Sequence, residues 1–237
     1  MTHRFVDTHC HFDFPPFTGN EAQSIAKAAE AGVQAIVVPS VEAADFSRVL
    51  TLSSRYPALY AALGLHPIVI ERHRDEHIEA LDEALQTAGD KLVAIGEIGL
   101  DFFMPGHDAG HQEAVFIEQL KIARDFDLPV LLHVRRSVDG VLKCLRRIRV
   151  RGGIAHAFNG SREQADEFIR LGFKLGFGGT MTYSRASRIR ELATSLPLES
   201  IVLETDAPDI PPSWLASGRN TPVELARIAG VLSGLRG

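Results

Sequence analysis

Short apolar runs alternate with amphipathic stretches along the whole chain. Most of the runs end in a polar residue or in a residue of a type that binds metals. Runs this short and this continuously apolar are typical of strands in a buried parallel sheet. Eight strands are predicted, at Arg4–His9, Gln34–Pro39, Leu59–Leu65, Lys91–Ile98, Pro129–Val134, Gly153–Phe158, Lys174–Gly179 and Ile201–Glu204.

The stretches between these runs carry apolar residues at helical spacing. Glu21–Ala31 and Ala43–Arg55 are two of them, and His111–Phe126 is the clearest. Ser161 precedes another such stretch and is a good N-cap for a helix. The last stretch begins at about Thr221 and ends with the chain, so we expect a short final helix.

Regular alternation of strands and helices indicates a parallel sheet covered by helices. Such a sheet is either open and doubly wound or closed into a barrel. Eight strand–helix units in 237 residues match the roughly 250 residues typical of a barrel. The ligand-type residues follow strands from the first unit to the last, and only a closed barrel brings those ends together. We therefore predict one α/β domain over residues 1–237, a (β/α)8 TIM-type barrel with a metal site at the C-terminal face of its strands.

The composition limits the classes of protein to which this chain can belong. Hydrophobic residues make up 45% and charged residues 23%, as in ordinary globular proteins. No apolar run approaches the roughly 20 residues that span a bilayer, and no signal-peptide pattern is present. Only Cys10 and Cys144 occur, which favours the cytoplasm. The net charge of -5 argues against a broad basic surface for nucleic acid, and no obligate protein partner is evident. The oligomeric state stays open.

Six residues of types that bind metals stand at predicted strand ends. His9 and His11 alternate, so they share one face of the strand. Each residue has an ordinary alternative, such as a core histidine or, for Glu97, an ion pair with an arginine. Their common placement favours a metal site, and nitrogen and oxygen ligands suit Zn, Mn, Co or Mg. The candidate ligands are His9, His11, Glu97, His133, His156 and Asp206.

Several motifs of the chain resemble those of the TatD family of metal-dependent deoxyribonucleases, within the amidohydrolase-like superfamily. They are DTHCHFD from Asp7, GLHP from Gly64, GEIGLD from Gly96, LHVR from Leu132, HAFNG from His156 and ETDAP from Glu204, and they cover nearly the whole chain. Ala157 and Asn159 depart from residues that are common in relatives, which affects expected substrate contacts and not the ligands.

The resemblance implies two divalent metals. One is expected on His9, His11, Glu97 and Asp206, and the second on Glu97, His133 and His156. Glu97 would then bridge the two ions. A carboxylated lysine is not expected as the bridge, because no lysine lies at the C-terminal end of a predicted strand.

The function predicted from the resemblance is hydrolysis of DNA phosphodiester bonds with a metal-activated water, the metals being roughly 3.5–4 Å apart. Asp206 is the expected general base or orienter of that water, and Glu97 the second catalytic residue. One alternative is another hydrolase of the superfamily that acts on a small ester, lactone, amide or phosphate ester. A second is a non-catalytic metal-binding barrel.

Three further residues are expected to lie near the predicted site. His66 should face the mouth of the barrel, and the resemblance suggests that it contacts substrate. Arg135 shares a face with His133 and would bind either a phosphate or a nearby carboxylate. Asp101 is placed either to orient a ligand histidine or to cap a loop.

Other residues of similar type are expected to play no part in the chemistry. Cys10 should point away from the two histidines that flank it. The arginine-rich run 146–151 is interpreted as a solvated helix end on the opposite face of the barrel. The remaining histidines that lie outside strand ends are expected to face solvent: His3, His73, His77, His107 and His111.

Overall fold

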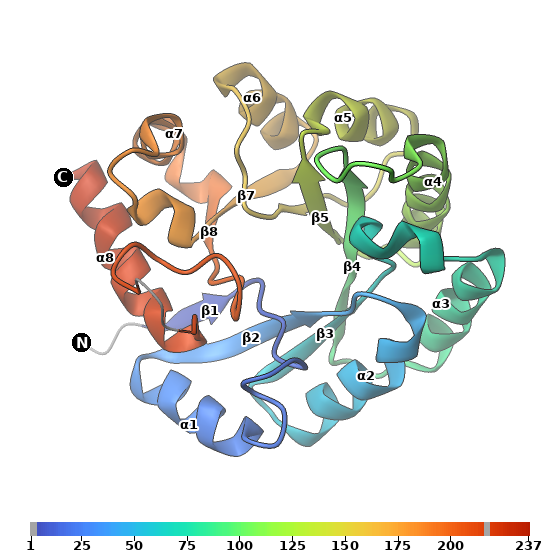
Figure 1. Ribbon diagram of the computed structural model, residues 1–237, viewed down its shortest axis with the longest axis horizontal. Coiled ribbons are helices and arrows are strands. Elements are labelled where there is room, and N and C mark those ends of the chain that lie inside the picture. The colour runs from blue at the N-terminus through green and yellow to red at the C-terminus, as the bar shows by residue number, and fades with distance from the viewer. Residues whose placement is uncertain (1–3, 216–218) are drawn as a thin grey trace.

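The computed structural model describes residues 4–215 and 219–237, which form one barrel of parallel strands with helices around it (Figure 1). Eight strands hydrogen-bond in the order β1 to β8, and every pairing is parallel. Their bounds are β1 Phe5–Asp7, β2 Val33–Pro39, β3 Leu59–Leu63, β4 Leu92–Asp101, β5 Val130–Arg135, β6 Gly153–Ala155, β7 Phe173–Phe177 and β8 Ile201–Leu203. The predicted TIM-type barrel is confirmed.

A helix follows each strand and packs on the outside of the sheet (Figure 1). The α-helices are α1 Glu21–Glu30, α2 Phe46–Arg55, α3 Asp75–Thr87, α4 Ala109–Asp125, α5 Val138–Arg147, α6 Arg162–Arg170, α7 Ser187–Ser195 and α8 Leu225–Arg236. Short 3-10 helices lie in the connections: η1 Ala43–Asp45, η2 Pro67–Arg72, η3 Gly179–Thr182, η4 Leu198–Ser200 and η5 Pro222–Glu224. The last helix, α8, has 12 residues and contributes buried Leu225, Ile228 and Leu232.

The strands and helices differ from their predicted bounds mainly at their ends. β1, β6 and β8 have three residues each, so His9, Phe158 and Glu204 lie beyond the strands that were expected to hold them. β4 instead continues to Asp101 and places Glu97 inside a strand. The predicted N-cap is confirmed, because the Ser161 hydroxyl accepts a hydrogen bond from the backbone N–H of Gln164 at 3.2 Å.

Apolar side chains fill the space on both sides of the sheet. Since alternate residues of a strand face opposite sides, Leu131 shares the inner face of β5 with His133, whereas Leu132 points toward the helices. A small inner cluster of Ala62, Ala94 and Leu131 forms the packed floor beneath the mouth. The larger cluster joins the outer faces of the strands to the helices and includes Cys10. Cys10 is fully buried there, in keeping with its expected direction.

The junction between β1 and β8 closes the barrel through residues that follow the two strands. The backbone N–H of Thr8 donates to the carbonyl of Leu203 at 3.2 Å, and that of Asp206 donates to the carbonyl of His9 at 2.9 Å. The N–H of His11 donates to the carbonyl of Ala207 at 2.8 Å. We call this junction the seam. It holds the chain segment around His9 directly against the segment around Asp206.

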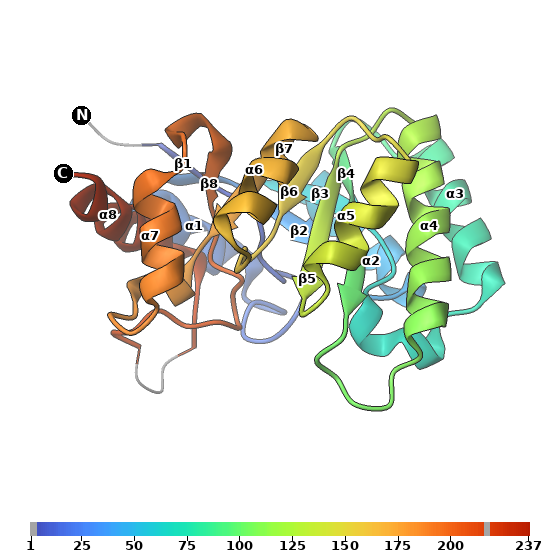
Figure 2. The same ribbon diagram turned by 90° about the horizontal axis from the view of Figure 1, so that it is seen from above.

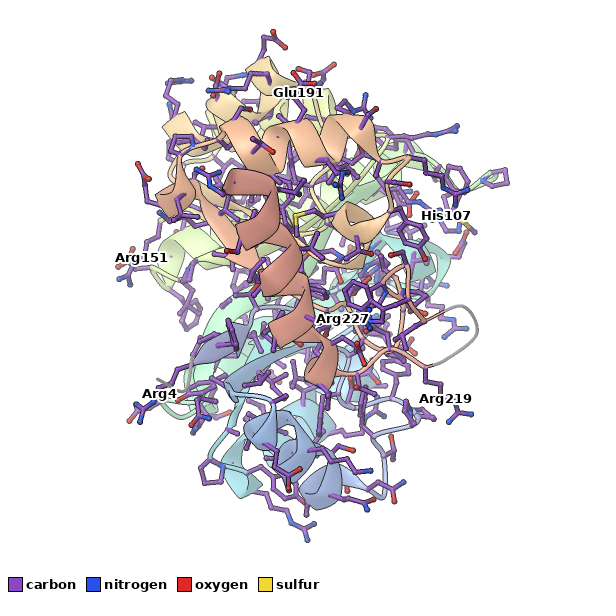
Figure 3. All side chains as sticks on the ribbon, turned by 90° about the vertical axis from the view of Figure 1, so that its left-hand side faces the viewer. Arg4, His107, Arg151, Glu191, Arg219 and Arg227 are labelled. Atoms are coloured by element: carbon purple, nitrogen blue, oxygen red, sulfur yellow. The ribbon has the colours of Figure 1, made fainter. Side chains whose placement is uncertain are left out.

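The two ends of the barrel carry different side chains. Arg4 and Arg151 lie at one end, and His107 and Arg219 lie at the other (Figure 3). The loops that follow β4 and β8 project from the same end (Figure 2), which is the C-terminal face of the strands. The arginine-rich run 146–151 therefore lies opposite the mouth, as predicted, and Arg146 pairs with Glu167 there at 3.1 Å. Within the described part of the chain, no helix is long and apolar enough to cross a membrane.

Candidate metal centre

All six predicted ligands gather at the C-terminal mouth of the barrel. His9 and His11 follow β1, Glu97 lies within β4, and His133 lies within β5. The other two come directly after short strands: His156 after β6 and Asp206 three residues beyond β8. Strand ends that are distant in sequence thus converge on one point, as predicted for a closed barrel.

Glu97 divides the site into two groups, one at each of its carboxylate oxygens. The first group lies around Oε2, which is 3.0 Å from His9 Nε2 and 3.6 Å from His11 Nε2. Asp206 Oδ1 faces the same two nitrogens at 3.6 and 3.8 Å. The structure therefore brings together the four residues expected to hold the first metal.

The second group lies around Oε1 of Glu97. This oxygen is 2.9 Å from His133 Nδ1 and 3.2 Å from His66 Nε2. His156 lies closer to the first group: its ring stacks on that of His9 at 3.8 Å between centroids, and its Nε2 is 3.6 Å from Asp206 Oδ1. Ligand atoms within 4.8 Å of one another occur in the sets His9–His11–Asp206, His9–Glu97–His156 and His66–Glu97–His133, and the expected second set is not among them.

Burial and neighbouring charge shape the protonation of these groups. Burial disfavours ionised Glu97, but the nearby rings of His66 and His9 outweigh it and hold its pKa well below the ordinary value. Burial raises the pKa of Asp206 to about 6, although His156 and His9 oppose the shift. Burial, with His9 beside it, lowers the pKa of His11 to about 3. Glu97 is thus ionised and His11 neutral at pH 7, the forms that bind cations.

Two additional carboxylates orient the histidines of the site. Asp101 Oδ2 is 3.0 Å from His133 Nε2, while its Oδ1 accepts hydrogen bonds from the backbone N–H groups of Phe103 and Met104. Asp101 is therefore both an orienting partner and a loop cap, the two alternatives left open by the sequence. Burial opposes its ionisation, but the bond to His133 lowers its pKa to about 2.

Glu204 is the corresponding partner of His156, and the sequence analysis did not single it out. Its Oε1 is 3.0 Å from His156 Nδ1, an ion-pair distance outside hydrogen-bond geometry, and accepts a hydrogen bond from the backbone N–H of Ala157 at 2.6 Å. A Cβ at Gly176 would approach Glu204 Oε2 to 2.2 Å, so the glycine makes room for this carboxylate. The available signal was the acidic residue that ends the apolar run before Asp206. A carboxylate on one ring nitrogen fixes which nitrogen faces a metal: Nδ1 for His133 and Nε2 for His156.

Asp7 is a second residue that sequence reasoning missed. It is fully buried at the seam and accepts hydrogen bonds from the backbone N–H of Thr205 at 2.9 Å and from the Thr205 hydroxyl. Burial raises its pKa to about 7 despite these bonds. Asp7 thus ties the segment that carries His9 to the segment that carries Asp206.

The polar atoms of the site fit a bound divalent cation. Nε2 of His9, the ring nitrogen that faces Glu97 and Asp206, is buried without a hydrogen-bond partner among the described residues. His9 Nε2 lies close to Glu97 Oε2 but not in hydrogen-bond geometry. A buried nitrogen left unpaired beside two carboxylates is unfavourable by itself, and it is satisfied when it binds a cation that the carboxylates share.

A cavity of about 1130 Å³ opens directly above the two groups. His66 and Arg135 both line it, as expected for substrate contacts. The Arg135 guanidinium stacks 3.8 Å from the centre of the Phe103 ring and is 3.8 Å from Asp101 Oδ2. Both interpretations of Arg135 are therefore compatible with its position.

The expectation for the remaining histidines is wrong at one position. His73 is fully buried directly after η2, and its Nε2 lies 2.9 Å from the carbonyl oxygen of His66, the residue before that helix. His77, His107 and His111 are partly exposed. His3 lies outside the described residues.

Comparison with known proteins places this chain in a family. The sequence model described as TatD related DNase matches residues 6–237. The chain belongs to this family. A metal-dependent hydrolase of Escherichia coli (strain K12), YjjV, is 50% identical over 237 residues, which make up 100% of this chain and 92% of the relative. A putative deoxyribonuclease of Danio rerio, tatdn3, is 35% identical over 220 residues, 88% of this chain and 81% of the relative.

The crystal structure of YjjV, described as a TatD homologue, has the same fold as the chain. It superimposes with a TM-score of 0.96 at 49% identity, covering 99% of this chain and 91% of the other. The predicted resemblance to the TatD family is confirmed, and the chain is a metal-dependent hydrolase of that family. The individual ligands, the number of metals and the substrate stay predictions.

Proposed function

We propose that this TatD-family hydrolase is a deoxyribonuclease that uses two divalent metals. The observation that supports the proposal best is the position of Glu97, whose two oxygens face separate groups of histidines at the base of an open cavity. The family description and the name of the Danio rerio relative both refer to DNA cleavage.

His9, His11, Glu97 and Asp206 are proposed to hold one metal, and Glu97, His133 and His156 the other. Zn, Mn, Mg and Co all suit these nitrogen and oxygen ligands. When bound, such a pair of ions polarises a phosphoryl oxygen and lowers the pKa of water. Asp101 and Glu204 keep the rings of His133 and His156 in the orientations that ligation needs.

Asp206 is the best-placed general base. Its side chain lies at the surface of the cavity, and because burial raises its pKa to about 6, the carboxylate is ionised at pH 7 yet basic enough to accept a proton. In the proposed step, a water oxygen forms a bond to phosphorus while one phosphate ester bond breaks. The water proton passes to Asp206, and the ester oxygen leaves with the departing strand.

Arg135 and His66 are proposed to position the substrate. Arg135 presents a planar guanidinium, about half exposed, whose orientation is set by the Phe103 ring. Such a group suits a phosphate oxygen pair. His66 approaches Glu97 from the cavity side and is buried enough to contact only a substrate that reaches the base of the site.

A second candidate is hydrolysis of a small ester, lactone, amide or phosphate ester. The same ligand groups would activate a carbonyl as well as a phosphoryl group, so the ligands alone do not favour either substrate. The size of the cavity, about 1130 Å³, favours a polymer that extends beyond the reacting bond.

Cleavage of a labelled single-stranded DNA oligonucleotide tests the proposal. Metal-stripped protein is assayed with and without Mg²⁺, Mn²⁺, Co²⁺ or Zn²⁺, beside a panel of small esters, lactones and amides. Glu97→Ala should abolish metal-dependent cleavage, whereas Glu191→Ala, an exposed carboxylate on α7 far from the mouth, should retain it (Figure 3). Turnover of the small-substrate panel without any cleavage of DNA would overturn the nuclease and support the second candidate.

A further inference from the structure

A second, smaller compartment adjoins the cavity above the metal groups. Its volume is about 530 Å³, and four of its lining residues also line the main cavity: Asn159, Thr180, Arg188 and Ile189. The outer wall comes from the segment between η3 and α7 and from the first turn of α7, and it includes Tyr183 and Arg185. The two hollows are thus parts of one continuous depression that leads away from Glu97.

Arg188 stands where the two hollows join. Its Nη2 donates a hydrogen bond to the Asn159 side-chain oxygen at 2.7 Å, which fixes the direction of the guanidinium. In the described part of the chain it forms no ion pair with a carboxylate, in contrast to Arg146, Arg162 and Arg170 on the outer helices. An oriented guanidinium without an acidic partner retains its capacity for an anion.

Arg185 and Tyr183 complete the wall of the compartment. The Arg185 guanidinium lies 5.5 Å from the centre of the Tyr183 ring. The Tyr183 hydroxyl donates to the carbonyl of Pro211 at 3.1 Å, which fastens the ring to the loop after β8. Arg185 is exposed and likewise has no carboxylate partner among the described residues. The compartment therefore combines two available cations with an anchored aromatic ring.

We propose that this compartment, formed by Asn159, Tyr183, Arg185 and Arg188, binds the nucleotide next to the phosphodiester that is cleaved. The inference rests on the proposed nuclease function and adds a requirement for substrate length. The arginines take the neighbouring phosphate, and the ring of Tyr183 offers a stacking surface for an unpaired base. This combination of cations and an aromatic surface is how proteins hold single strands without reading their sequence.

The test compares long with short substrates. For each protein, kcat/KM is measured on single-stranded oligonucleotides of increasing length and on a small aryl phosphodiester, and the ratio of the long to the short value is the readout. Arg188→Ala should lower this ratio about tenfold, since each arginine contributes one charge-assisted contact. Arg185→Ala should lower it less, and Arg188→Lys should restore part of it because the charge returns without the planar fork.

Arg149→Ala is the matched control, because Arg149 is also an exposed arginine but belongs to the run at the opposite end of the barrel. Its ratio should equal that of the parent protein. The salt dependence of oligonucleotide binding should also decrease in Arg188→Ala, by roughly the contribution of one phosphate contact. An unchanged ratio together with an unchanged salt dependence would overturn the compartment as a nucleotide site.

The outcome can be separated from failure of the nuclease itself. If the protein hydrolyses small esters but no DNA, the proposed function is wrong, and the compartment is then tested by fluorescence anisotropy with a labelled single-stranded octanucleotide. Weaker binding in Arg188→Ala than in Arg149→Ala would support the site. Equal binding in both variants, or no binding to the parent protein, would overturn it.

Discussion

Two pairs of buried carboxylates lie around the mouth of this barrel, and they differ in what neutralises them. Asp101 and Glu204 each face a histidine nitrogen at 3.0 Å, and the pKa of each is lowered although burial opposes it. Asp7 and Asp206 have no nitrogen cation so close, and burial raises their pKa values to about 7 and about 6. Similar burial thus gives opposite shifts.

The difference separates carboxylates whose charge is compensated by other residues of the chain from carboxylates that need a bound cation or a proton. Asp101 and Glu204 are compensated within the chain, by His133 and His156, as long as those rings carry a proton. Asp206 is compensated only partly, its nearest histidine nitrogens being 3.6 Å away, and a bound cation would supply the remainder. Asp7 has hydrogen-bond donors but no cation, and it holds a proton up to about neutral pH.

The largest expected effect comes from removing the charge of Asp206. Asp206→Asn should lower kcat about 10³-fold, because the general base and a metal ligand are lost together. Cleavage of a labelled oligonucleotide and the metal content of the purified protein provide the measurements. Asp209→Asn, an exposed carboxylate that lines the same cavity, is the control and should keep its activity within about threefold. Similar losses in both variants would mean that general negative charge at the mouth, and not Asp206, is needed.

Asp7→Asn tests the seam through the pH dependence of stability. Because the pKa of folded Asp7 is raised to about 7, the folded protein keeps a proton that the unfolded chain releases near pH 4. This group therefore makes the parent protein less stable as pH rises from 4 to 7, and it adds no further change above 7. Relative to the parent, metal-stripped Asp7→Asn should gain on the order of 4 kcal/mol over that range. Denaturant unfolding at several pH values measures the gain, and parallel pH profiles would contradict it.

The two orienting carboxylates should give an intermediate effect. Glu204→Gln and Asp101→Asn leave the candidate ligands in place but remove the negative charge behind His156 and His133, so metal affinity should fall about 10- to 100-fold. Competition with a metal-sensitive chelator dye measures the affinity. Folding should be preserved, which far-UV circular dichroism checks. An unchanged metal affinity would show that the negative charge of these two carboxylates does not support metal binding.

The smallest effect is expected for Arg135→Ala. The guanidinium is about half exposed and lies 3.8 Å from Asp101, so its contribution to the low pKa of that carboxyl is screened by solvent. Metal affinity should change by less than about threefold, while KM for an oligonucleotide should rise about tenfold if Arg135 binds phosphate. A large loss of metal affinity would indicate that Arg135, and not His133 alone, compensates the charge of Asp101.

The sequence was sufficient to predict the architecture and to name six residues that gather at the mouth. Apolar runs that end in His, Glu or Asp predict strands whose ends meet, and the barrel does bring His9 and Asp206 together at the seam. The ends of the strands could not be read in this way, because buried apolar residues continue beyond the last residue of a strand, as at Phe158, whose N–H still donates to the carbonyl of Gly176.

Contacts between residues far apart in the sequence could not be predicted either. Glu204 and Asp7 are ordinary acidic residues in the sequence, and their roles depend on what lies across the barrel: the Gly176 position that leaves room for one, and Thr205 that binds the other. His73 lies in no periodic pattern because η2 is a short 3-10 helix, so nothing in the sequence showed that its ring packs inward against the carbonyl of His66.

The seam has a consequence for how the protein is made. Asp206 leaves the ribosome 197 residues after His9, yet the structure places them side by side. A nascent chain therefore carries His9 and His11 but no complete first ligand group until the segment after β8 has been synthesised. The order of translation thus delays assembly of the candidate centre until the chain has grown past Asp206.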